Sequence, residues 1–314
     1  MSNTVTMVMG YPASGKSTIT KKMAAAPNTV ILNRDSVGGT VLDLLPKMEQ
    51  ELKNGNNVIL DNLFPTIESR DPFIKAAQMY HGAKVNCVLM GTTIEEAQFN
   101  AVQRAIGLLG EFPTPEAIKK AKHPNIFPPA VLFKYKKEFQ KPTKTEGFDS
   151  VEVEKFIRQD DVAFTNKAII LDYDGTLREC INGNGKYPVS KDQVEIKPNR
   201  KKVLDSYREG GYLLLGMSNQ SGVHKGDLSE ELAHELFQHT NQLLDVEIEY
   251  NFCPHQSAPI SCYCRKPMPG KGVEMILKHK LRRQDCIMVG DYTSDKTFAE
   301  RSGFQYVDQA EFFK

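Results

Sequence analysis

The sequence predicts an α/β protein with two doubly wound parallel-sheet domains, one in each half of the chain. Residues 4–9 form an apolar strand that leads directly into a glycine-rich loop. Residues 168–171, halfway along the chain, form a second apolar strand that ends in two carboxylates. Because continuous apolar runs are typical of strands buried on both faces of a parallel sheet, each run indicates a sheet of its own.

The composition is that of a soluble protein with two domains. A chain of 314 residues with 40% hydrophobic residues can bury two cores. Its formal net charge of +1 does not point to nucleic acid, whose binding proteins are usually basic. No apolar run approaches the roughly 20 residues that span a membrane, so we expect no membrane partner. Six unevenly placed cysteines and the lack of a signal segment favour an intracellular protein, cytoplasmic or, in a eukaryote, nuclear.

The glycine-rich loop of residues 10–17 matches the pattern G-x-x-x-x-G-K-S between a strand and a helix. Its backbone N–H groups and the helix N-terminus can surround phosphate oxygens. Lys16 would reach the β- and γ-phosphates of ATP, and Ser17 would hold Mg²⁺. The predicted ATP-binding residues are Gly10, Ser14, Gly15, Lys16, Ser17, Thr18 and Asp61.

Strands and helices alternate through the rest of this half, which predicts a doubly wound sheet. Carboxylates follow two of the strands, at Asp35 and Asp61. A carboxylate at the carboxyl edge of a sheet can accept a proton from an attacking hydroxyl or support Mg²⁺. Asp35 can equally well cap the next helix, and the residues alone leave both roles open.

Together with segments 32–36, 59–62 and 146–148, this loop resembles the kinase domain of the polynucleotide 5′-kinase/3′-phosphatases, most like the animal type. The resemblance implies that Asp35 is the general base on a terminal 5′-hydroxyl. It also implies that Arg104 is a lid arginine against the phosphates of the donor; the alternative is a solvated charge on a helix face. Phage members carry an arginine for the acceptor phosphate where this sequence has Val37 and Gly38.

A lysine cluster and a polar segment close this half. Lys134, Lys136 and Lys137 could follow a nucleic-acid backbone with Tyr135 as a stacking surface, or they could form a solvated helix face. The charged stretch 158–166 is the predicted linker. We therefore predict domains at 1–160 and 161–314.

The segment Asp172-Tyr173-Asp174-Gly175-Thr176 resembles motif one of the haloacid-dehalogenase-type phosphatases. In such chemistry a carboxylate attacks phosphorus and forms an aspartyl-phosphate, and a second acid protonates the leaving oxygen. Asp172 would be the nucleophile and Asp174 the acid/base. Mg²⁺ would offset the repulsion between the carboxylates and the phosphate.

Three further pieces follow in the order that this family requires. Ser218 ends a strand and can bind phosphate, and Lys266 supplies a positive charge. Asp291 ends another strand and would hold Mg²⁺ together with Asp172 and Asp174. Asp295 would orient a metal-bound water or Lys266. The alternative is an α/β domain without this chemistry.

A third cluster consists of Cys253, His255, Cys262 and Cys264. Three sulfurs and an imidazole suit tetrahedral Zn²⁺, and because all four positions are filled we expect a structural metal. The alternative is a group of reduced cysteines without metal. Together with segments 218–222 and 264–267, this loop resembles the histidinol-phosphate and heptose-bisphosphate phosphatase branch. The resemblance covers about residues 167–308. The segment 180–189 is too short for a large cap domain.

The two halves together predict a nucleic-acid end-healing enzyme. One half would phosphorylate 5′-hydroxyl ends of DNA or RNA with ATP, and the other would remove 3′-phosphates, giving the ends that a ligase in the same pathway needs. One alternative is a small-molecule kinase fused to a histidinol-phosphate- or heptose-bisphosphate-type phosphatase. Another is a binding module with a degenerate catalytic half.

Overall fold

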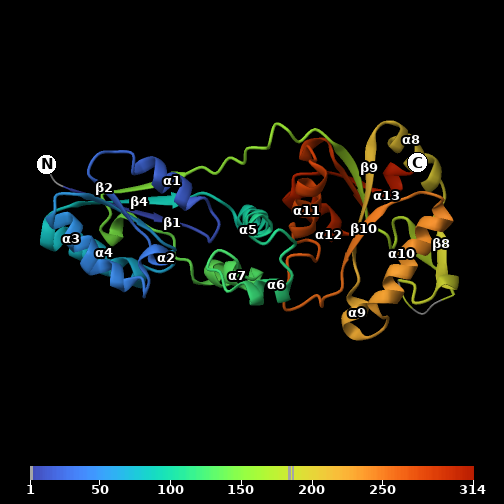
Figure 1. Cartoon of the computed structure of the whole chain (residues 1–314), viewed down its shortest axis with the longest axis horizontal. Coiled ribbons are helices and arrows are strands. Elements are labelled where there is room, and N and C mark those ends of the chain that lie inside the picture. The colour runs from blue at the N-terminus through green and yellow to red at the C-terminus, as the bar shows by residue number, and fades with distance from the viewer. Residues whose placement is uncertain (1–2, 183–184, 186) are drawn as a thin grey trace. The chain divides into compact units, whose positions relative to one another are not determined.

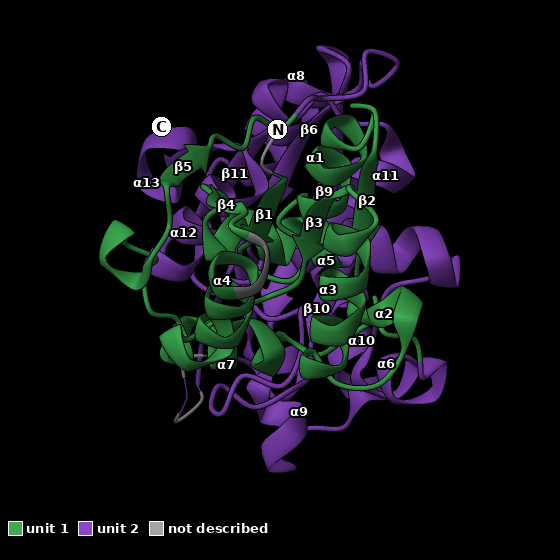
Figure 2. Cartoon of the chain, turned by 90° about the vertical axis from the view of Figure 1, so that its left-hand side faces the viewer, with its two compact units in different colours: residues 1–101, 123–158 green, residues 102–122, 159–314 purple. Residues whose placement is uncertain are grey.

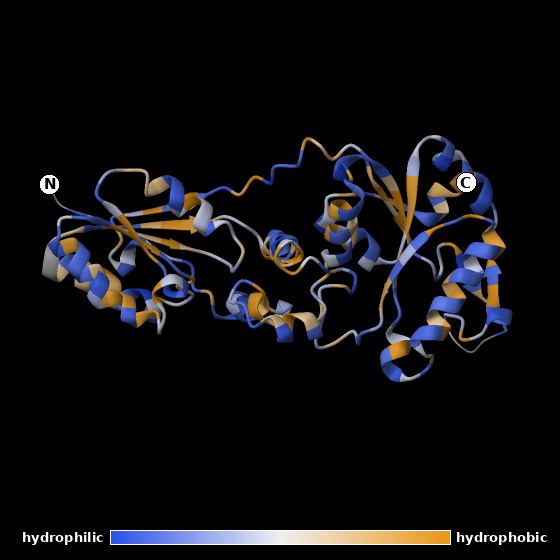
Figure 3. Cartoon of the chain, viewed as in Figure 1, coloured by the Kyte–Doolittle hydropathy of each residue, from blue (hydrophilic) through white to orange (hydrophobic). Residues whose placement is uncertain are grey.

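The computed structural model describes residues 3–182, 185 and 187–314 of the chain, which divides into two compact units (Figure 1). The N-terminal unit comprises Met1–Ala101 and His123–Arg158, and the C-terminal unit comprises Val102–Lys122 and Gln159–Lys314 (Figure 2). Each unit contains one five-stranded parallel sheet, and hydrophobic residues concentrate in the strands of both (Figure 3). The predicted fold class is therefore confirmed.

The sheet of the N-terminal unit has the strand order β2-β3-β1-β4-β5. In central β1, Val5 pairs with Val58 on one side and with Val85 on the other. The strands are β1 (Thr4–Met9), β2 (Thr29–Leu32), β3 (Asn57–Asp61), β4 (Lys84–Met90) and β5 (Ser150–Glu154). The helices that start in this unit are α1 (Lys16–Met23), α2 (Arg34–Val37), α3 (Leu45–Lys53), α4 (Ile67–His81), α5 (Ile94–Leu109) and α7 (Pro129–Glu138).

The sheet of the C-terminal unit has the order β10-β9-β6-β11-β12, again with its first strand in the centre. Ile169 of β6 pairs with Leu214 and Ile287 on its two sides. The strands are β6 (Lys167–Leu171), β9 (Tyr212–Asn219), β10 (Glu249–Cys253), β11 (Ile287–Gly290) and β12 (Gln305–Asp308), with a separate hairpin of β7 (Arg178–Cys180) and β8 (Val194–Ile196). The helices are α6 (Pro115–Ala121), α8 (Arg200–Glu209), α9 (Ser221–Lys225), α10 (Glu230–Leu244), α11 (Gly270–His279), α12 (Thr293–Ser302) and α13 (Gln309–Phe312).

The units differ from the predicted domains in one segment. The break at 158/159 lies two residues from the predicted boundary at 160/161, but residues 102–122 group with the C-terminal unit. The Nζ of Lys271 lies 4.0 Å from the ring centroid of Phe112, which holds this segment to α11. Because α5 is a continuous helix, its sequence carries no signal for a division inside it.

Two further predictions concern Tyr135 and the segment 180–189. Tyr135 is only 4% exposed and packs against Tyr11 and Phe139, so of the two alternatives for the lysine cluster the one with Tyr135 as a stacking surface is excluded. The predicted short cap segment, 180–189, includes residues 183, 184 and 186, which lie outside the described part of the chain. No helix in the described residues is both long and apolar enough to cross a membrane.

A buried ion pair ties three segments of the N-terminal unit together. Arg70 of α4 is fully buried, and its guanidinium donates to both carboxylate oxygens of Glu146 at 2.6 and 3.0 Å. It also donates to the backbone oxygens of Phe64 and Gln140, each at 3.0 Å. Phe64 and Gln140 lie in irregular segments and Glu146 ends a short 3₁₀ helix, so one side chain fixes the positions of all three.

We predict that Arg70→Met destabilises the N-terminal unit by about 3–5 kcal/mol, because it leaves the Glu146 carboxylate buried without its partner. Urea unfolding followed by far-UV circular dichroism measures the change. The matched control is Lys75→Ala on the same helix, which breaks an exposed pair with Asp71 and should cost no more than about 1 kcal/mol. Equal effects of the two substitutions would contradict this prediction.

Candidate functional site

The loop between β1 and α1 has a backbone that only glycine allows at its two ends. Gly10 has φ +149°, and a Cβ there would lie 2.8 Å from the Cβ of Met90. Gly15 has φ +92° and immediately precedes α1. Side chains at these positions would force the loop to shift. Glycine at these two positions allows the tight loop conformation that is typical of phosphate-binding loops.

The loop is braced from the segment that follows β4. Thr92 donates its hydroxyl to the backbone oxygen of Ser14 at 2.8 Å, and Asn100 of α5 donates its amide to the backbone oxygen of Ala13, also at 2.8 Å. The Ser14 hydroxyl is buried and has no hydrogen-bond partner among the described residues. A buried hydroxyl that lacks a partner is suited to a ligand oxygen.

Lys16 and Ser17 lie at the start of α1, as the motif requires. The Lys16 ammonium donates to the backbone oxygens of Gly10 at 3.1 Å and Tyr11 at 2.8 Å, so it lies across its own loop. Ser17 donates its hydroxyl to a carboxylate oxygen of Asp61, at the end of β3, at 2.9 Å. A hydroxyl next to a carboxylate offers the oxygen ligands that Mg²⁺ prefers. Thr18 is exposed on the first turn of α1.

Asp35 does not cap α2. The cap is Asn33, whose side-chain oxygen accepts the backbone N–H of Asp35 at 2.7 Å. The Asp35 carboxylate is 41% exposed and pairs with Arg34 at 2.7 Å. Asn33 also donates to the backbone oxygen of Asp61 at 2.8 Å, which places Asp35 at the carboxyl edge of the sheet beside β3. The capping alternative is therefore excluded, and the role of Asp35 as a general base stays a prediction.

Arg104 lies in α5, within the segment that groups with the C-terminal unit. Burial raises the pKa of Tyr263, and the positive charge of Arg104 partly opposes that rise. Since Tyr263 stands between Cys262 and Cys264, Arg104 is near the cysteine loop. Its contact with the phosphates of a donor stays a prediction.

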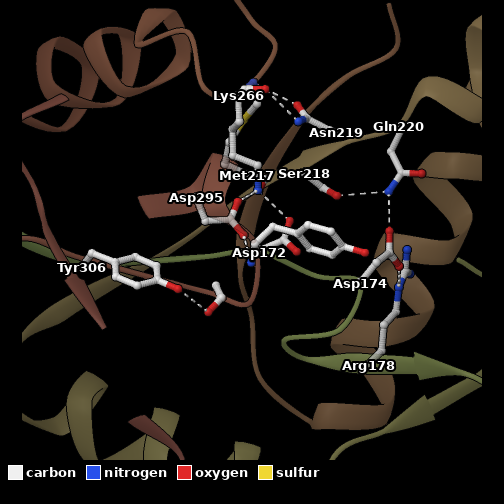
Figure 4. A network of polar contacts seen from close by, with 12 residues as sticks. Asp172, Asp174, Arg178, Met217, Ser218, Asn219, Gln220, Lys266, Asp295 and Tyr306 are labelled. Atoms are coloured by element: carbon white, nitrogen blue, oxygen red, sulfur yellow. Dashed lines mark hydrogen bonds and ion pairs between the residues drawn. The ribbon is translucent and has the colours of Figure 1, made fainter. Parts of the chain in front are cut away.

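In the C-terminal unit, Lys266 holds the centre of the predicted phosphatase site (Figure 4). Its ammonium lies 2.6 Å from a carboxylate oxygen of Asp172 and 2.6 Å from one of Asp295. It also donates to the backbone oxygen of Met217 at 2.7 Å. All three charged side chains are buried. Burial alone would lower the pKa of Lys266, but the two carboxylates outweigh this and raise it.

Burial and the charges around Lys266 change the pKa of Asp172. Burial raises its pKa to about 7, and Lys266 offsets only part of that rise. The nearby carboxylates of Asp295 and Asp174 raise the pKa further. The site therefore carries more negative charge than one ammonium compensates, which favours binding of a cation.

Asp172, Asp291 and Asp295 form a group that could hold a metal ion, since their ligand oxygens all lie within 4.8 Å of one another. Gly175 makes this possible: it has φ +87°, and a Cβ there would collide with the Asp291 carboxylate. Carboxylate oxygens suit hard divalent cations. Asp291 and Asp172 come together as predicted, and Asp295 joins them.

The Asp174 carboxylate, which we also predicted as a metal ligand, does not belong to this group. It instead accepts from Arg178 at 2.8 Å and from the amide of Gln220 at 2.7 Å. The same Gln220 amide lies 3.1 Å from the Ser218 hydroxyl. The structure thus brings Ser218 and Asp174 together through Gln220.

Sequence reasoning missed three residues that position this site. Arg178 and Gln220 aim Asp174, and Asn219 binds both the backbone N–H and the backbone oxygen of Lys266, at 2.9 and 3.0 Å. Asn219 and Gln220 directly follow Ser218, which the sequence did identify, so their closeness to Ser218 in the chain could have indicated them. Arg178 gave no such signal, because its place depends on hydrogen bonds to Leu236 and Thr240 of the distant helix α10.

Cys253, His255, Cys262 and Cys264 converge as predicted. Their ligand atoms lie within 4.8 Å of one another, with Sγ–Sγ separations of 3.2 and 3.7 Å for Cys253 with Cys264 and Cys262. This compact set of three sulfurs and one imidazole fits a four-coordinate metal ion. The loop is tied to the site because the backbone N–H of Gln220 donates to the oxygen of Cys253 at 2.8 Å.

The other three cysteines lie outside this cluster. Cys87 and Cys286 are buried, and burial raises the pKa of their thiols to about 12 and about 11. Cys180 is half-buried. A thiol with a raised pKa is a poor nucleophile and a poor ligand, so Cys87 and Cys286 are structural residues.

Comparison with known proteins gives relatives of two kinds, while no family model matches the chain. The chain is 32% identical over 136 residues, 42% of this chain and 76% of the relative, to D-glycero-beta-D-manno-heptose-1,7-bisphosphate 7-phosphatase of Helicobacter pylori. It is 30% identical over 149 residues, 47% of this chain and 32% of the relative, to bifunctional polynucleotide phosphatase/kinase of Schizosaccharomyces pombe.

Two solved structures resemble part or all of the chain with low TM-scores. A chain of the Pnkp1/Rnl/Hen1 RNA repair complex is 19% identical, with 98% of this chain and 96% of that chain covered and a TM-score of 0.33. D,D-heptose 1,7-bisphosphate phosphatase from B. bronchiseptica, complexed with magnesium and phosphate, is 22% identical, with 45% and 79% covered and a TM-score of 0.41.

The raised pKa of Asp172 predicts a pH-dependent phosphatase. Only the carboxylate form can attack, so at low divalent-cation concentration kcat/KM should fall as the pH drops below about 7. A bound divalent cation favours the carboxylate form, so saturating Mg²⁺ should move this acid limb to lower pH. Rates on p-nitrophenyl phosphate at low and saturating Mg²⁺ measure the shift. An acid limb at the same pH in both series would contradict the assignment.

Proposed function

Since the chain belongs to the family of the D-glycero-beta-D-manno-heptose-1,7-bisphosphate 7-phosphatases, we propose that its C-terminal unit hydrolyses phosphomonoesters. We further propose that the whole chain is a bifunctional enzyme that heals nucleic-acid ends, with ATP, Mg²⁺ and Zn²⁺ as its cofactors. The observation that carries this proposal is the presence of two phosphoryl-transfer sites on one chain. The first is the loop with Lys16, Ser17 and Asp61, and the second is the group around Asp172 and Lys266.

In the kinase reaction, the phosphates of ATP lie against the backbone of the glycine-rich loop. Lys16 exchanges its two backbone acceptors for the β- and γ-phosphate oxygens. Ser17 and Asp61 would hold Mg²⁺, which neutralises charge on the phosphates when bound. Asp35 accepts the proton of the 5′-hydroxyl as its oxygen attacks the γ-phosphorus, and the bond from that phosphorus to the β–γ bridging oxygen breaks, which releases ADP. The pair with Arg34 holds the Asp35 carboxylate at the reacting edge until a substrate arrives.

In the phosphatase reaction, an oxygen of Asp172 attacks the phosphorus of a 3′-phosphate, and the bond to the 3′-oxygen breaks. Asp174 gives a proton to that leaving oxygen and later takes one from the water that hydrolyses the aspartyl-phosphate. Lys266 and the Ser218 hydroxyl bind the phosphoryl oxygens. Asp172, Asp291 and Asp295 would hold Mg²⁺, which offsets the repulsion between anions when bound.

Substrates and partners follow from the two products. A 5′-phosphate and a 3′-hydroxyl are the ends that a nucleic-acid ligase joins, so a ligase is the expected consumer of the product. The polynucleotide phosphatase/kinase relative supports this pairing of activities. We propose DNA or RNA ends as the substrates of both sites.

A second candidate is a small-molecule kinase fused to a sugar-phosphate phosphatase. The cysteine loop and the heptose-bisphosphate relatives favour it. A panel of heptose bisphosphate, histidinol phosphate and a 3′-phosphorylated oligonucleotide, compared by kcat/KM, separates the two candidates.

The main test uses an oligonucleotide with a 5′-hydroxyl and a 3′-phosphate, incubated with ATP and Mg²⁺. The protein should convert both ends. Lys16→Ala should abolish phosphorylation alone, because it removes the γ-phosphate contact, and Asp172→Asn should abolish dephosphorylation alone. Gel mobility and radiolabel transfer measure each end separately. An oligonucleotide left unchanged at both ends would refute the function, and loss of both activities from one substitution would refute independent sites.

The cysteine cluster predicts a structural Zn²⁺. The protein should contain about one zinc ion per chain, and Cys264→Ser should remove it, because a closed four-ligand site rarely survives loss of a thiolate. Phosphatase activity should fall with it, since Lys266 lies two residues further on, while kinase activity should remain. Metal analysis and both assays test this, with Cys180→Ser as the control thiol outside the cluster. Full zinc content in Cys264→Ser would contradict the assignment.

A further inference from the structure

Tyr292 is an exposed aromatic residue at the edge of the phosphatase site. It directly follows Asp291 at the carboxyl end of β11, and its side chain is 51% exposed. Among the residues described in the C-terminal unit, it is the one exposed aromatic side chain. Single exposed rings are common on protein surfaces, so it is the position of Tyr292 beside the reacting centre that matters here.

The end of β11 carries a second aromatic residue. Tyr306 of β12 donates its hydroxyl to the backbone oxygen of Gly290 at 3.1 Å, which puts a second ring beside the same strand end (Figure 4). Aromatic side chains are the surfaces on which proteins stack the bases of single-stranded nucleic acid.

The position of Tyr292 also fits the geometry of the substrate. The phosphoryl group of a 3′-phosphate must lie among Asp172, Lys266 and Asp291, so the nucleoside that carries it extends outward over the rim of the site. Asp291 is exposed, and Tyr292 is its immediate neighbour on that rim. A base carried by that nucleoside would lie on the same rim as this ring.

We propose that Tyr292 stacks on the terminal base of the strand whose 3′-phosphate occupies the site. This inference rests on the proposed function and names the part of the substrate that the site recognises. Stacking needs the face of the base and not its edges, so recognition is tolerant of sequence. It also needs a base released from its neighbour, so the site prefers single-stranded 3′-ends to blunt duplex ends.

The experiment compares Tyr292→Ala and Tyr292→Phe with the unmodified enzyme on three substrates. These are a single-stranded oligonucleotide with a 3′-phosphate, the same oligonucleotide with an abasic 3′-terminal nucleotide, and p-nitrophenyl phosphate. For Tyr292→Ala, the ratio of kcat/KM on the first substrate to that on p-nitrophenyl phosphate should fall roughly 10- to 100-fold, mainly through KM. The abasic oligonucleotide should show no such fall, and Tyr292→Phe should keep the ratio.

The matched control is Leu243→Ala, which removes a side chain of similar exposure, 49%, from the end of α10. Its ratio should stay unchanged. Equal losses on all three substrates would show that Tyr292 only supports the fold of the site and would overturn the proposal, as would an unchanged ratio in Tyr292→Ala. No turnover of any 3′-phosphorylated oligonucleotide by the unmodified enzyme would instead refute the proposed function itself.

Discussion

Both candidate sites depend on one constraint, the central position of the first strand in a parallel sheet. In each unit the chain starts in the middle, forms the two strands on one side of the first strand and then crosses to form the two on the other side. The carboxyl end of the first strand therefore opens where the strand order reverses, and loops on either side diverge from it. β1 delivers the glycine-rich loop to this point, and β6 delivers Asp172. The neighbouring strands add Asp61 in one unit and Asp291 in the other.

The two units use this position with different sets of charges. The N-terminal site combines backbone donors and Lys16, which suit a ligand that brings its own negative charge, with the carboxylates of Asp35 and Asp61. The C-terminal site gathers buried carboxylates around Lys266, whose single charge cannot compensate them. Such a group is stable only with its lysine in place, and this explains why Asn219 fixes the Lys266 backbone at two points.

Sequence reasoning predicted most of this arrangement because its signals are local. The loop at Lys16, the carboxylates after β6 and β11, and the cysteine cluster each lie within a few residues, and short spacing limits where they can go. Residues 102–122 and Arg178 escaped prediction because their places depend on packing between distant segments. The capping role of Asn33 was missed for a different reason. Asn33 and Asp35 are both good helix caps, and only the backbone conformation decides between them.

The similarity to heptose-bisphosphate phosphatases and the proposed role on nucleic-acid ends are compatible, because they concern different parts of the site. Asp172, Lys266 and the metal-binding carboxylates act on the phosphoryl group, which is the same in a sugar phosphate and in a strand terminus. A site of this kind determines which reaction occurs at phosphorus, but it does not select the alcohol that departs. Substrate choice must then come from residues on the rim, where the leaving group lies. Tyr292 is such a residue, and an aromatic ring can stack on the flat face of a base.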